Sequence, residues 1–137
     1  MSDFWQGRRI LITGHTGFKG AWLSHWLMAR GSRVYGLALE PETEPSLFSQ
    51  LDLARRMDHA ILDVRNAGAV RQRVETVAPD VVFHLAAQPL VRRSYREPVE
   101  TFSTNVMGTV HVLDALRTAS ARVAVVSITT DKVYENR

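Results

Sequence analysis

The chain has 137 residues and a mass of 15.4 kDa, which is enough for about one domain with its own core. Hydrophobic residues make up 45% of it and charged residues 23%, which excludes a disordered or collagen-like chain. The absence of cysteine excludes a disulfide scaffold and a cysteine nucleophile, and is consistent with a cytoplasmic protein. No apolar run reaches the roughly 18 residues of a membrane helix, so we expect no membrane association.

The net charge of +3 and the isoelectric point near 9.8 raise the question of a nucleic-acid partner. Fifteen of the 17 basic residues are arginines, with Lys19 and Lys132 as the exceptions, and they are spread along the chain among acidic residues. No basic run of five or more occurs, so the sequence does not predict a phosphate-tracking surface. Scattered arginines favour a small anionic ligand such as a diphosphate.

Short apolar runs alternate with longer amphipathic stretches, which is the pattern of a parallel sheet covered by helices. In chain order we predict strand 9–13, helix 16–30, strand 34–39, loop 40–49, helix 49–57, strand 59–64, helix 67–78, strand 81–86, helix 98–119 and strand 122–129. The predicted fold class is therefore α/β, a doubly wound parallel sheet of the Rossmann type.

Two predicted helices carry stripes of large apolar residues. In helix 16–30, Phe18, Trp22 and Trp26 recur every four residues, and we interpret them as the face that packs in the core. Leu23 and Leu27 widen this stripe. The main stripe of helix 98–119 consists of Val99, Phe102, Val106, Val110 and Leu113. Met107 and Val112 lie off that stripe, and a second apolar face favours a contact with another subunit.

The last predicted strand, 122–129, is strongly apolar. In the strand order 3-2-1-4-5-6 it would form an uncovered edge of the sheet, and natural proteins normally cover such an edge. We therefore expect residues 1–137 to be the N-terminal part of a longer polypeptide, incomplete at the C-terminal edge of its sheet.

Gly14, Gly17 and Gly20 lie between the first strand and the first helix, spaced three residues apart. The first glycine permits a tight turn, the second lets a pyrophosphate approach the backbone, and the third allows the helix to pack closely on the strand. The N–H groups at the start of the helix then face the phosphates. The alternative is a purely structural tight turn.

Glu40 follows the second predicted strand, 20 positions after Gly20, where an acidic residue binds the adenosine ribose hydroxyls in such domains. No arginine or lysine lies between Gly36 and Leu53 to bind a 2′-phosphate. We therefore predict NAD rather than NADP as the cofactor. The alternative for Glu40 is a solvated loop carboxylate.

Four segments, in this order, resemble the extended short-chain dehydrogenase/reductase family: Thr13–Gly20, Asp63–Arg65, Phe83–Ala87 and Thr104–Thr109. The resemblance covers nearly the whole chain. It implies that Asp63 contacts the adenine amino group and that the loop after the fourth strand passes beneath the nicotinamide ribose. The cofactor-binding residues that it implies are Gly14, His15, Thr16, Gly17, Phe18, Gly20, Glu40, Asp63, Val64, Leu85, Ala86, Ala87 and Thr104.

Within that family, the stretches Gly14–Gly20, His84–Arg92 and Thr129–Arg137 resemble the nucleotide-sugar 4,6-dehydratases. Lys19 replaces the apolar residue of most relatives, and Lys132 replaces the glutamate of most dehydratases. Both departures are similar to the CDP-glucose subgroup, so the resemblance implies CDP-glucose as the substrate and deoxysugar synthesis as the context.

The chemistry implied by the resemblance is an internal redox cycle. A hydride leaves sugar C4 for NAD while a base takes the proton of the 4-hydroxyl. The resulting 4-ketone acidifies the C5 proton, so that this proton and the C6 hydroxyl leave as water, and the hydride returns to C6. The resemblance implies that Thr130 contacts the 4-hydroxyl, that Asp131 protonates the leaving C6 hydroxyl, and that Lys132 occupies the position of the C5 base. Lys132 is either that base or a group that polarises the enolate. The alternative for the three residues is a solvated turn at a strand end.

The family also uses a Tyr-x-x-x-Lys pair, which is absent here, because Leu39 and Val99 stand four residues after Tyr35 and Tyr95. We expect it, and the sugar-binding lobe, further along the polypeptide. The family forms dimers through its long helix, which implies a homodimer through 98–119. The rival functions are a 4-epimerase of the same family, which has no use for an acid and a C5 base, and a non-catalytic NAD-binding module.

His84 interrupts an apolar strand, and we interpret it as a hydrogen-bonded core histidine rather than a catalytic residue. The five histidines show no paired spacing, so we predict no metal site. Ser94 lies in the loop after the fourth strand, and its contact with cofactor or sugar is left open.

Overall fold

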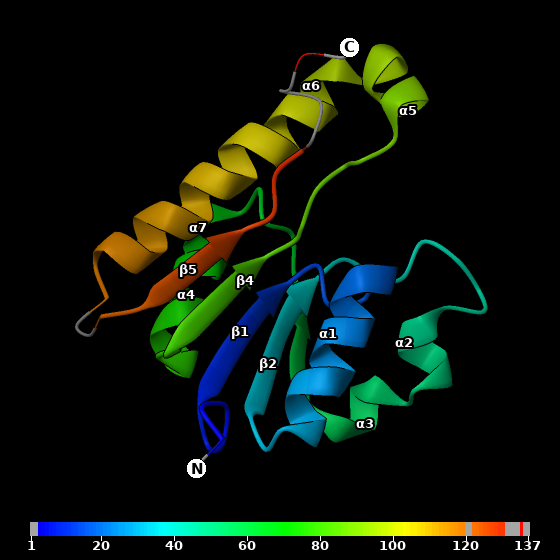
Figure 1. Cartoon of the computed structure of the whole chain (residues 1–137). Coiled ribbons are helices and arrows are strands. Elements are labelled where there is room, and N and C mark those ends of the chain that lie inside the picture. Colours follow the sequence, from blue (N-terminus) through cyan, green and yellow to red (C-terminus); the bar gives the residue numbers. More distant parts are fainter. Residues whose placement is uncertain (1–2, 120–121, 131–134, 136–137) are drawn as a thin grey trace.

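The computed structural model describes residues 3–119, 122–130 and 135, and these residues build a five-stranded parallel sheet (Figure 1). The strands are β1 (Arg9–Thr13), β2 (Arg33–Ala38), β3 (Asp58–Ile61), β4 (Val81–His84) and β5 (Ala124–Ser127). Their order in the sheet is β3-β2-β1-β4-β5, and every pairing is parallel. This arrangement confirms the predicted doubly wound fold class.

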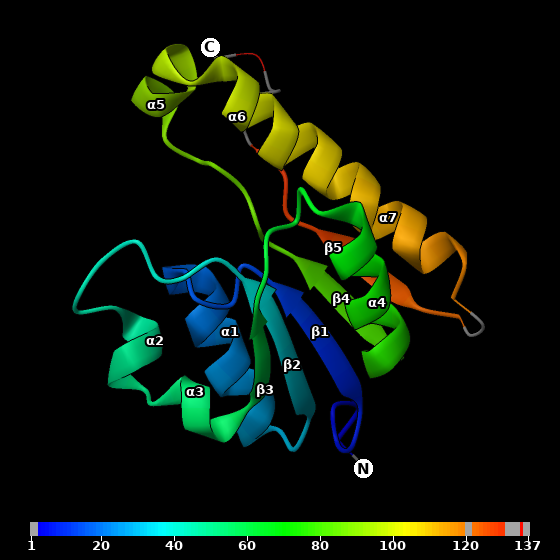
Figure 2. The ribbon, with the colours of Figure 1, turned by 180° about the vertical axis from the view of Figure 1, so that it is seen from behind.

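Helices cover the sheet on both faces (Figure 1, Figure 2). On one face lie α1 (Phe18–Ala29), α2 (Leu47–Gln50) and α3 (Leu53–Arg56), and on the other lie α4 (Ala67–Val77) and α7 (Gly108–Arg117). The segments α6 (Pro98–Phe102), η1 (Ser103–Met107, a π-helix) and α7 form one rod that extends past the sheet toward α5 (Val91–Arg96). Two buried clusters, one on each face, form the core.

Two of the predicted helices differ from the observed ones. The predicted helix 49–57 is two short helices, because Asp52 between them has a left-handed backbone with φ of 49°. The predicted helix 98–119 is continuous but contains the π-helical segment, and α5 was not predicted. Strand β4 ends at His84 rather than at residue 86. The Leu85 amide is shared between the carbonyl and the hydroxyl of Thr13, and the Ala86 amide donates to that hydroxyl.

Helix α1 buries only part of the predicted face, because Leu27 of the predicted stripe is buried whereas its three aromatic residues are not. Its buried residues are Gly20, Ala21, Ser24 and Leu27. Phe18, Trp22 and Trp26 are 70%, 50% and 46% exposed, so the expectation that these three residues pack in the core is wrong. The physical reason is Gly20, where a Cβ would overlap the carbonyl oxygen of Gly14. The glycine side of the helix must therefore face the sheet, and the aromatic residues on the opposite side face outward.

Helix α7 follows the same rule. Its buried residues are Gly108, Val112 and Ala115, and a Cβ at Gly108 would lie 2.7 Å from the side chain of Val64. The predicted main stripe is exposed instead; its members are Val99, Phe102, Val106, Val110 and Leu113. The rod does have two apolar faces, as predicted, but Val112 belongs to the core and the large stripe to the outer surface.

Strand β5 forms an exposed edge, as the strand order predicts. It pairs only with β4 among the described residues, and all four of its residues are exposed. No helix of the described part of the chain lies over β5 on the face that α1 covers (Figure 1).

The orientation of α1 predicts that substitutions at two of its residues change the free energy of unfolding by very different amounts. Leu27→Ala removes a fully buried side chain and should lower the free energy of unfolding by ~2–5 kcal/mol. Phe18→Ala removes an exposed ring and should lower it by less than about 1 kcal/mol. Urea denaturation of both variants measures the difference, and a larger loss in Phe18→Ala would contradict the observed rotation of the helix.

Candidate functional site

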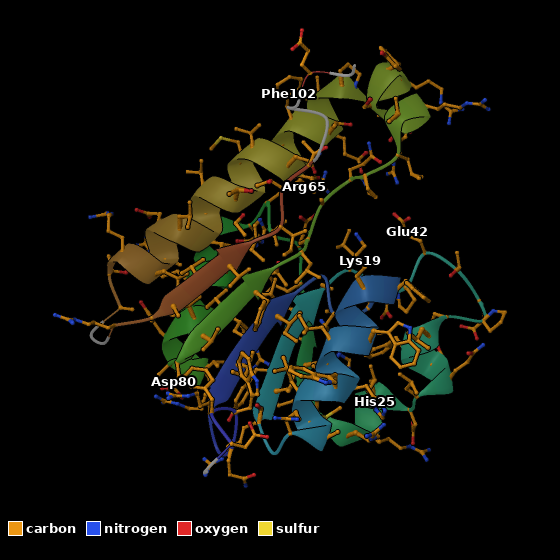
Figure 3. All side chains as sticks on the ribbon, viewed as in Figure 1. Lys19, His25, Glu42, Arg65, Asp80 and Phe102 are labelled. Atoms are coloured by element: carbon orange, nitrogen blue, oxygen red, sulfur yellow. The ribbon has the colours of Figure 1, made fainter. Side chains whose placement is uncertain are left out.

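A cleft of about 670 Å³ opens at the carboxyl ends of the parallel strands, where open α/β sheets bind ligands. The loop Gly14–Gly20 forms its floor, and the segments that follow β2, β3, β4 and β5 supply its walls. Figure 3 shows Lys19, Glu42 and Arg65 around this end of the sheet, with Asp80 at the opposite end.

Twelve of the thirteen residues predicted to bind a cofactor line this one cleft: Gly14, Thr16, Gly17, Phe18, Gly20, Glu40, Asp63, Val64, Leu85, Ala86, Ala87 and Thr104. His15 is the exception and does not line it. Of the predicted catalytic residues, Thr130 directly follows the lining residue Thr129 and is exposed. Asp131 and Lys132 lie outside the described residues.

The three glycines of the loop meet different constraints. Gly14 has φ of +77°, and a Cβ there would lie 2.9 Å from the amide nitrogen of Ala86. Gly20 has no room for a Cβ because of the backbone of Gly14 and His15. A Cβ at Gly17 would meet only the carbonyl oxygen of Gly14, at an ordinary 3.5 Å. Gly17 is therefore the one glycine of the three whose missing side chain leaves space for a ligand rather than for the protein.

The first turn of α1 presents a positive potential to the cleft. Gly17 is the N-cap residue, no side chain among the described residues caps the turn, and the turn contains no acidic residue. Lys19 lies in this turn and lines the cleft. Because the first N–H groups of a helix lack intrahelical partners, this end suits a phosphate or another anion.

A chain of hydrogen bonds ties β1 and β4 to the rod. The Thr13 hydroxyl is 2.7 Å from His84 Nδ1, and it accepts the amides of Leu85 and Ala86 at 3.1 and 3.0 Å. His84 Nε2 is 3.0 Å from the Thr109 hydroxyl, which in turn donates to a backbone carbonyl of the rod. Because Thr109 donates its proton to that carbonyl, it can only accept from His84. His84 Nε2 therefore carries a proton, and Nδ1 accepts from the Thr13 hydroxyl. Burial lowers the pKa of His84, and the ring is the hydrogen-bonded core histidine that the sequence predicts.

The next turn of the same wall is held by two amide side chains. Asn105, in the π-helical segment, accepts the Gln88 amide at 2.7 Å and donates to the Gln88 carbonyl at 3.0 Å. The Gln88 side chain accepts the Leu90 amide at 2.7 Å and donates to the Thr101 hydroxyl at 3.0 Å. These bonds fasten the loop after β4 to the rod, and they were not predicted.

Charged pairs surround the rim of the cleft. Arg93 on α5 contacts Glu42 across the cleft at 3.3 Å, and it also pairs with Glu97 and Glu100, both at 2.8 Å. Asp63, at the end of β3, accepts the backbone amide and the Nε of Arg65, both at 2.8 Å. The hydrogen bond from the Arg65 side chain lowers the pKa of Asp63, which keeps this carboxylate ionised.

His15 points away from the cleft. Its ring is fully buried, packs edge-on against Phe48 and His59, and has no hydrogen bond of ordinary geometry on either nitrogen among the described residues. Burial lowers its pKa to about 4, helped by the neighbouring His59. The side chain of His15 therefore belongs to the core under the loop, and only its backbone belongs to the loop surface.

Among the described residues, no three or more acidic or histidine side chains come together as a metal site, and no helix is long and apolar enough to cross a lipid bilayer.

The parallel sheet, with its glycine-rich turn into α1 and its cleft at the strand ends, defines a Rossmann-type α/β domain. A family model described as GDP-mannose 4,6 dehydratase matches residues 11–136. The chain belongs to this family, within the extended short-chain dehydrogenases/reductases.

Individual relatives agree with this membership. The chain is 52% identical to CDP-glucose 4,6-dehydratase of Salmonella typhimurium over 135 residues, which are 98% of this chain and 38% of that protein. Among solved structures, UDP-glucose 4-epimerase of Thermus thermophilus in complex with NAD is 29% identical, with a TM-score of 0.72 over 81% of this chain and 34% of the other. UDP-glucose-4-epimerase of Stenotrophomonas maltophila, with a TM-score of 0.81 at 23% identity over 95% of this chain and 39% of the other, shares the fold. The chain thus spans well under half the length of these relatives.

The buried, neutral ring of His15 predicts loss of stability in acid. The unfolded chain binds a proton near pH 6.5 and the folded chain only near 4, so unfolding takes up a proton between these values. The free energy of unfolding should therefore fall by up to about 3 kcal/mol through this group as the pH is lowered from 6.5 to 4.

Urea denaturation at several pH values measures this loss. A His15→Phe variant lacks the titrating ring, whereas its carboxylates titrate as in the parent. The difference in stability between the two chains should grow as the pH falls, and a constant difference would contradict the prediction.

Proposed function

We propose that this chain is the NAD-binding part of a CDP-glucose 4,6-dehydratase, a lyase that converts CDP-D-glucose to CDP-4-dehydro-6-deoxy-D-glucose. The observation that carries the proposal is the 52% identity to a CDP-glucose 4,6-dehydratase over nearly the whole chain. The cleft, lined by twelve of the residues that the resemblance implies for the cofactor, supports the NAD-binding part of the proposal. A cytoplasmic location stays a prediction.

The cleft fits a dinucleotide on physical grounds. Gly17 leaves the loop open on the ligand side, and the uncapped start of α1 with Lys19 suits a diphosphate. Glu40 lines the same cleft at the end of β2, where it would accept hydroxyl groups of the adenosine ribose. When bound, NAD supplies a hydride acceptor and donor, and the residues of this chain bind and orient it.

The reaction also needs groups that act on the sugar, and the segment after β5 supplies candidates for them. We propose that Thr130 contacts the sugar 4-hydroxyl, that Asp131 protonates the leaving C6 hydroxyl, and that Lys132 acts at C5. Thr130 follows the cleft-lining segment Ile128–Thr129, which is consistent with a place beside the ligand. An acid that keeps its proton at neutral pH needs burial or a neighbouring negative charge.

A homodimer through the rod is the finer part of the proposal. The outer stripe of the rod is exposed, and three of its residues, Val99, Phe102 and Val106, border an apolar groove together with Pro98, Ser103 and Met107. Phe102 is 67% exposed, which is unusual for a ring in an apolar neighbourhood. A monomeric mass of the intact gene product in analytical ultracentrifugation would contradict this contact.

A 4-epimerase is the second candidate, because relatives of that activity also match the chain, at 32% identity. An epimerase returns the hydride to C4, keeps the C6 hydroxyl, and needs neither Asp131 nor Lys132. A non-catalytic NAD-binding module is the third.

Incubation of the intact gene product with CDP-, dTDP-, GDP- and UDP-glucose tests the three candidates together. We expect a 4-keto sugar, detected by its absorbance in alkali, from CDP-glucose alone. Mass spectrometry should show the loss of one water. A product of unchanged mass with inverted C4 would favour the epimerase, and NAD binding without any product would favour the module.

Two glycine variants test which glycine of the loop makes room for the ligand and which makes room for the packing of the protein itself. Gly17→Ala adds a methyl group that the protein accommodates, so it should keep the stability but weaken NAD binding by about tenfold or more. Gly20→Ala forces the helix away from the loop and should lower both the stability and the affinity for NAD. Calorimetric titration with NAD and urea denaturation measure the two effects. Unchanged affinity in Gly17→Ala would place the diphosphate elsewhere.

A further inference from the structure

The side chain of His15 is the one member of the glycine loop that no role described above requires. It is fully buried, and neither ring nitrogen has a hydrogen bond of ordinary geometry among the described residues, although the Leu37 carbonyl acts on the ring as a weak acceptor. Burying a polar group without a good hydrogen bond is unfavourable, so an aliphatic residue would be more favourable at a position that only filled the core. Its position is therefore best explained by its shape and by the elements that it touches.

The ring fits a notch in the sheet. Gly36 lies opposite Ile12 of β1 and opposite His59 of β3, so one row across the sheet reads isoleucine, glycine, histidine. A Cβ at Gly36 would lie 2.5 Å from the His15 ring. The missing side chain of Gly36 is thus the space that His15 occupies.

The same ring reaches the opposite wall of the cleft. Its centroid lies 5.3 Å from that of Phe48 on α2, and 5.2 Å from that of His59. Helix α2 follows directly on the loop 40–46, and several residues of that loop line the cleft. The buried side chain of His15 therefore contacts both the core beneath the glycine loop and α2, the helix that follows the loop 40–46.

We propose that His15 is a positioning residue: its ring, seated over Gly36 and against Phe48, fixes the spacing between the glycine loop and the 40–46 loop, and so sets the shape of the dinucleotide cleft. It touches no ligand atom. The consequence for binding rests on the proposed function, whereas the consequence for the loop does not. Ordering a loop before the ligand arrives raises affinity because less ordering remains to be done on binding.

Three variants test the fit between His15 and Gly36. His15→Ala empties the notch, and Gly36→Ala fills it and displaces the ring; neither changes a residue that lines the cleft. Each alone should speed hydrogen exchange of the Gly14 and Gly17 amides by about tenfold or more, because the Gly14 amide donates to the Leu37 carbonyl of β2 and the Gly17 amide donates to the Gly14 carbonyl. In the double variant, the methyl group added at position 36 enters vacated space, so the second change should add little to the first. Additive effects would overturn the proposal.

His15→Phe keeps an aromatic ring and removes both nitrogens. If the ring acts by its shape, this variant should retain slow exchange of the loop amides and bind NAD within about twofold of the parent. A large loss of affinity with intact stability would instead show that a histidine nitrogen contacts the ligand, which would also overturn the proposal.

The matched control is Val74→Ala, a substitution in the buried cluster of the opposite face. It should destabilise the chain without changing exchange at Gly14 or Gly17 and without weakening NAD binding. His15→Ala and Gly36→Ala should weaken NAD binding by about tenfold at comparable stability. NAD binding is measured on the intact gene product, and its failure to bind NAD would count against the proposed function alone, because the exchange measurements need no ligand.

Discussion

The structure depends on one contact between two backbones, that of Gly20 in the first turn of α1 and that of Gly14 at the end of β1. No side-chain atom fits between them, so the helix starts directly against the end of the strand. This contact aims the first-turn amides at the cleft and selects the side of α1 that faces the sheet. The contact between Gly14 and Gly20 thus determines both the floor of the site and the packing of α1 on the sheet.

The same constraint explains which parts of the fold are readable from sequence. Element order and sheet type follow from apolar runs and turn residues, and they were predicted. The rotation of the helices was not, because hydrophobic periodicity cannot distinguish a stripe that faces the core from one that faces outward. In α1 and α7 the smallest residues, Gly20 and Gly108, mark the buried side. A glycine inside a predicted helix is therefore the better guide to its inner face.

The candidate site divides in a similar way. Residues that follow a strand were predictable, because parallel strands bring their carboxyl ends to one edge. The contact of Arg93 with Glu42 and the pairing of Gln88 with Asn105 were not, because each joins segments far apart in sequence without a local pattern. His15 was grouped with the loop surface since it lies between two lining residues, but its ring turns under the loop into the notch at Gly36.

The hydrogen bonds that link His84 into the wall of the cleft all run in one direction. From Thr13 through His84 and Thr109 to the carbonyl of Asn105, each proton points the same way along the row. Reversing one donor would leave two acceptors or two protons face to face in a buried place. Loss of the Thr109 hydroxyl alone would therefore leave the His84 Nε2 proton without this acceptor.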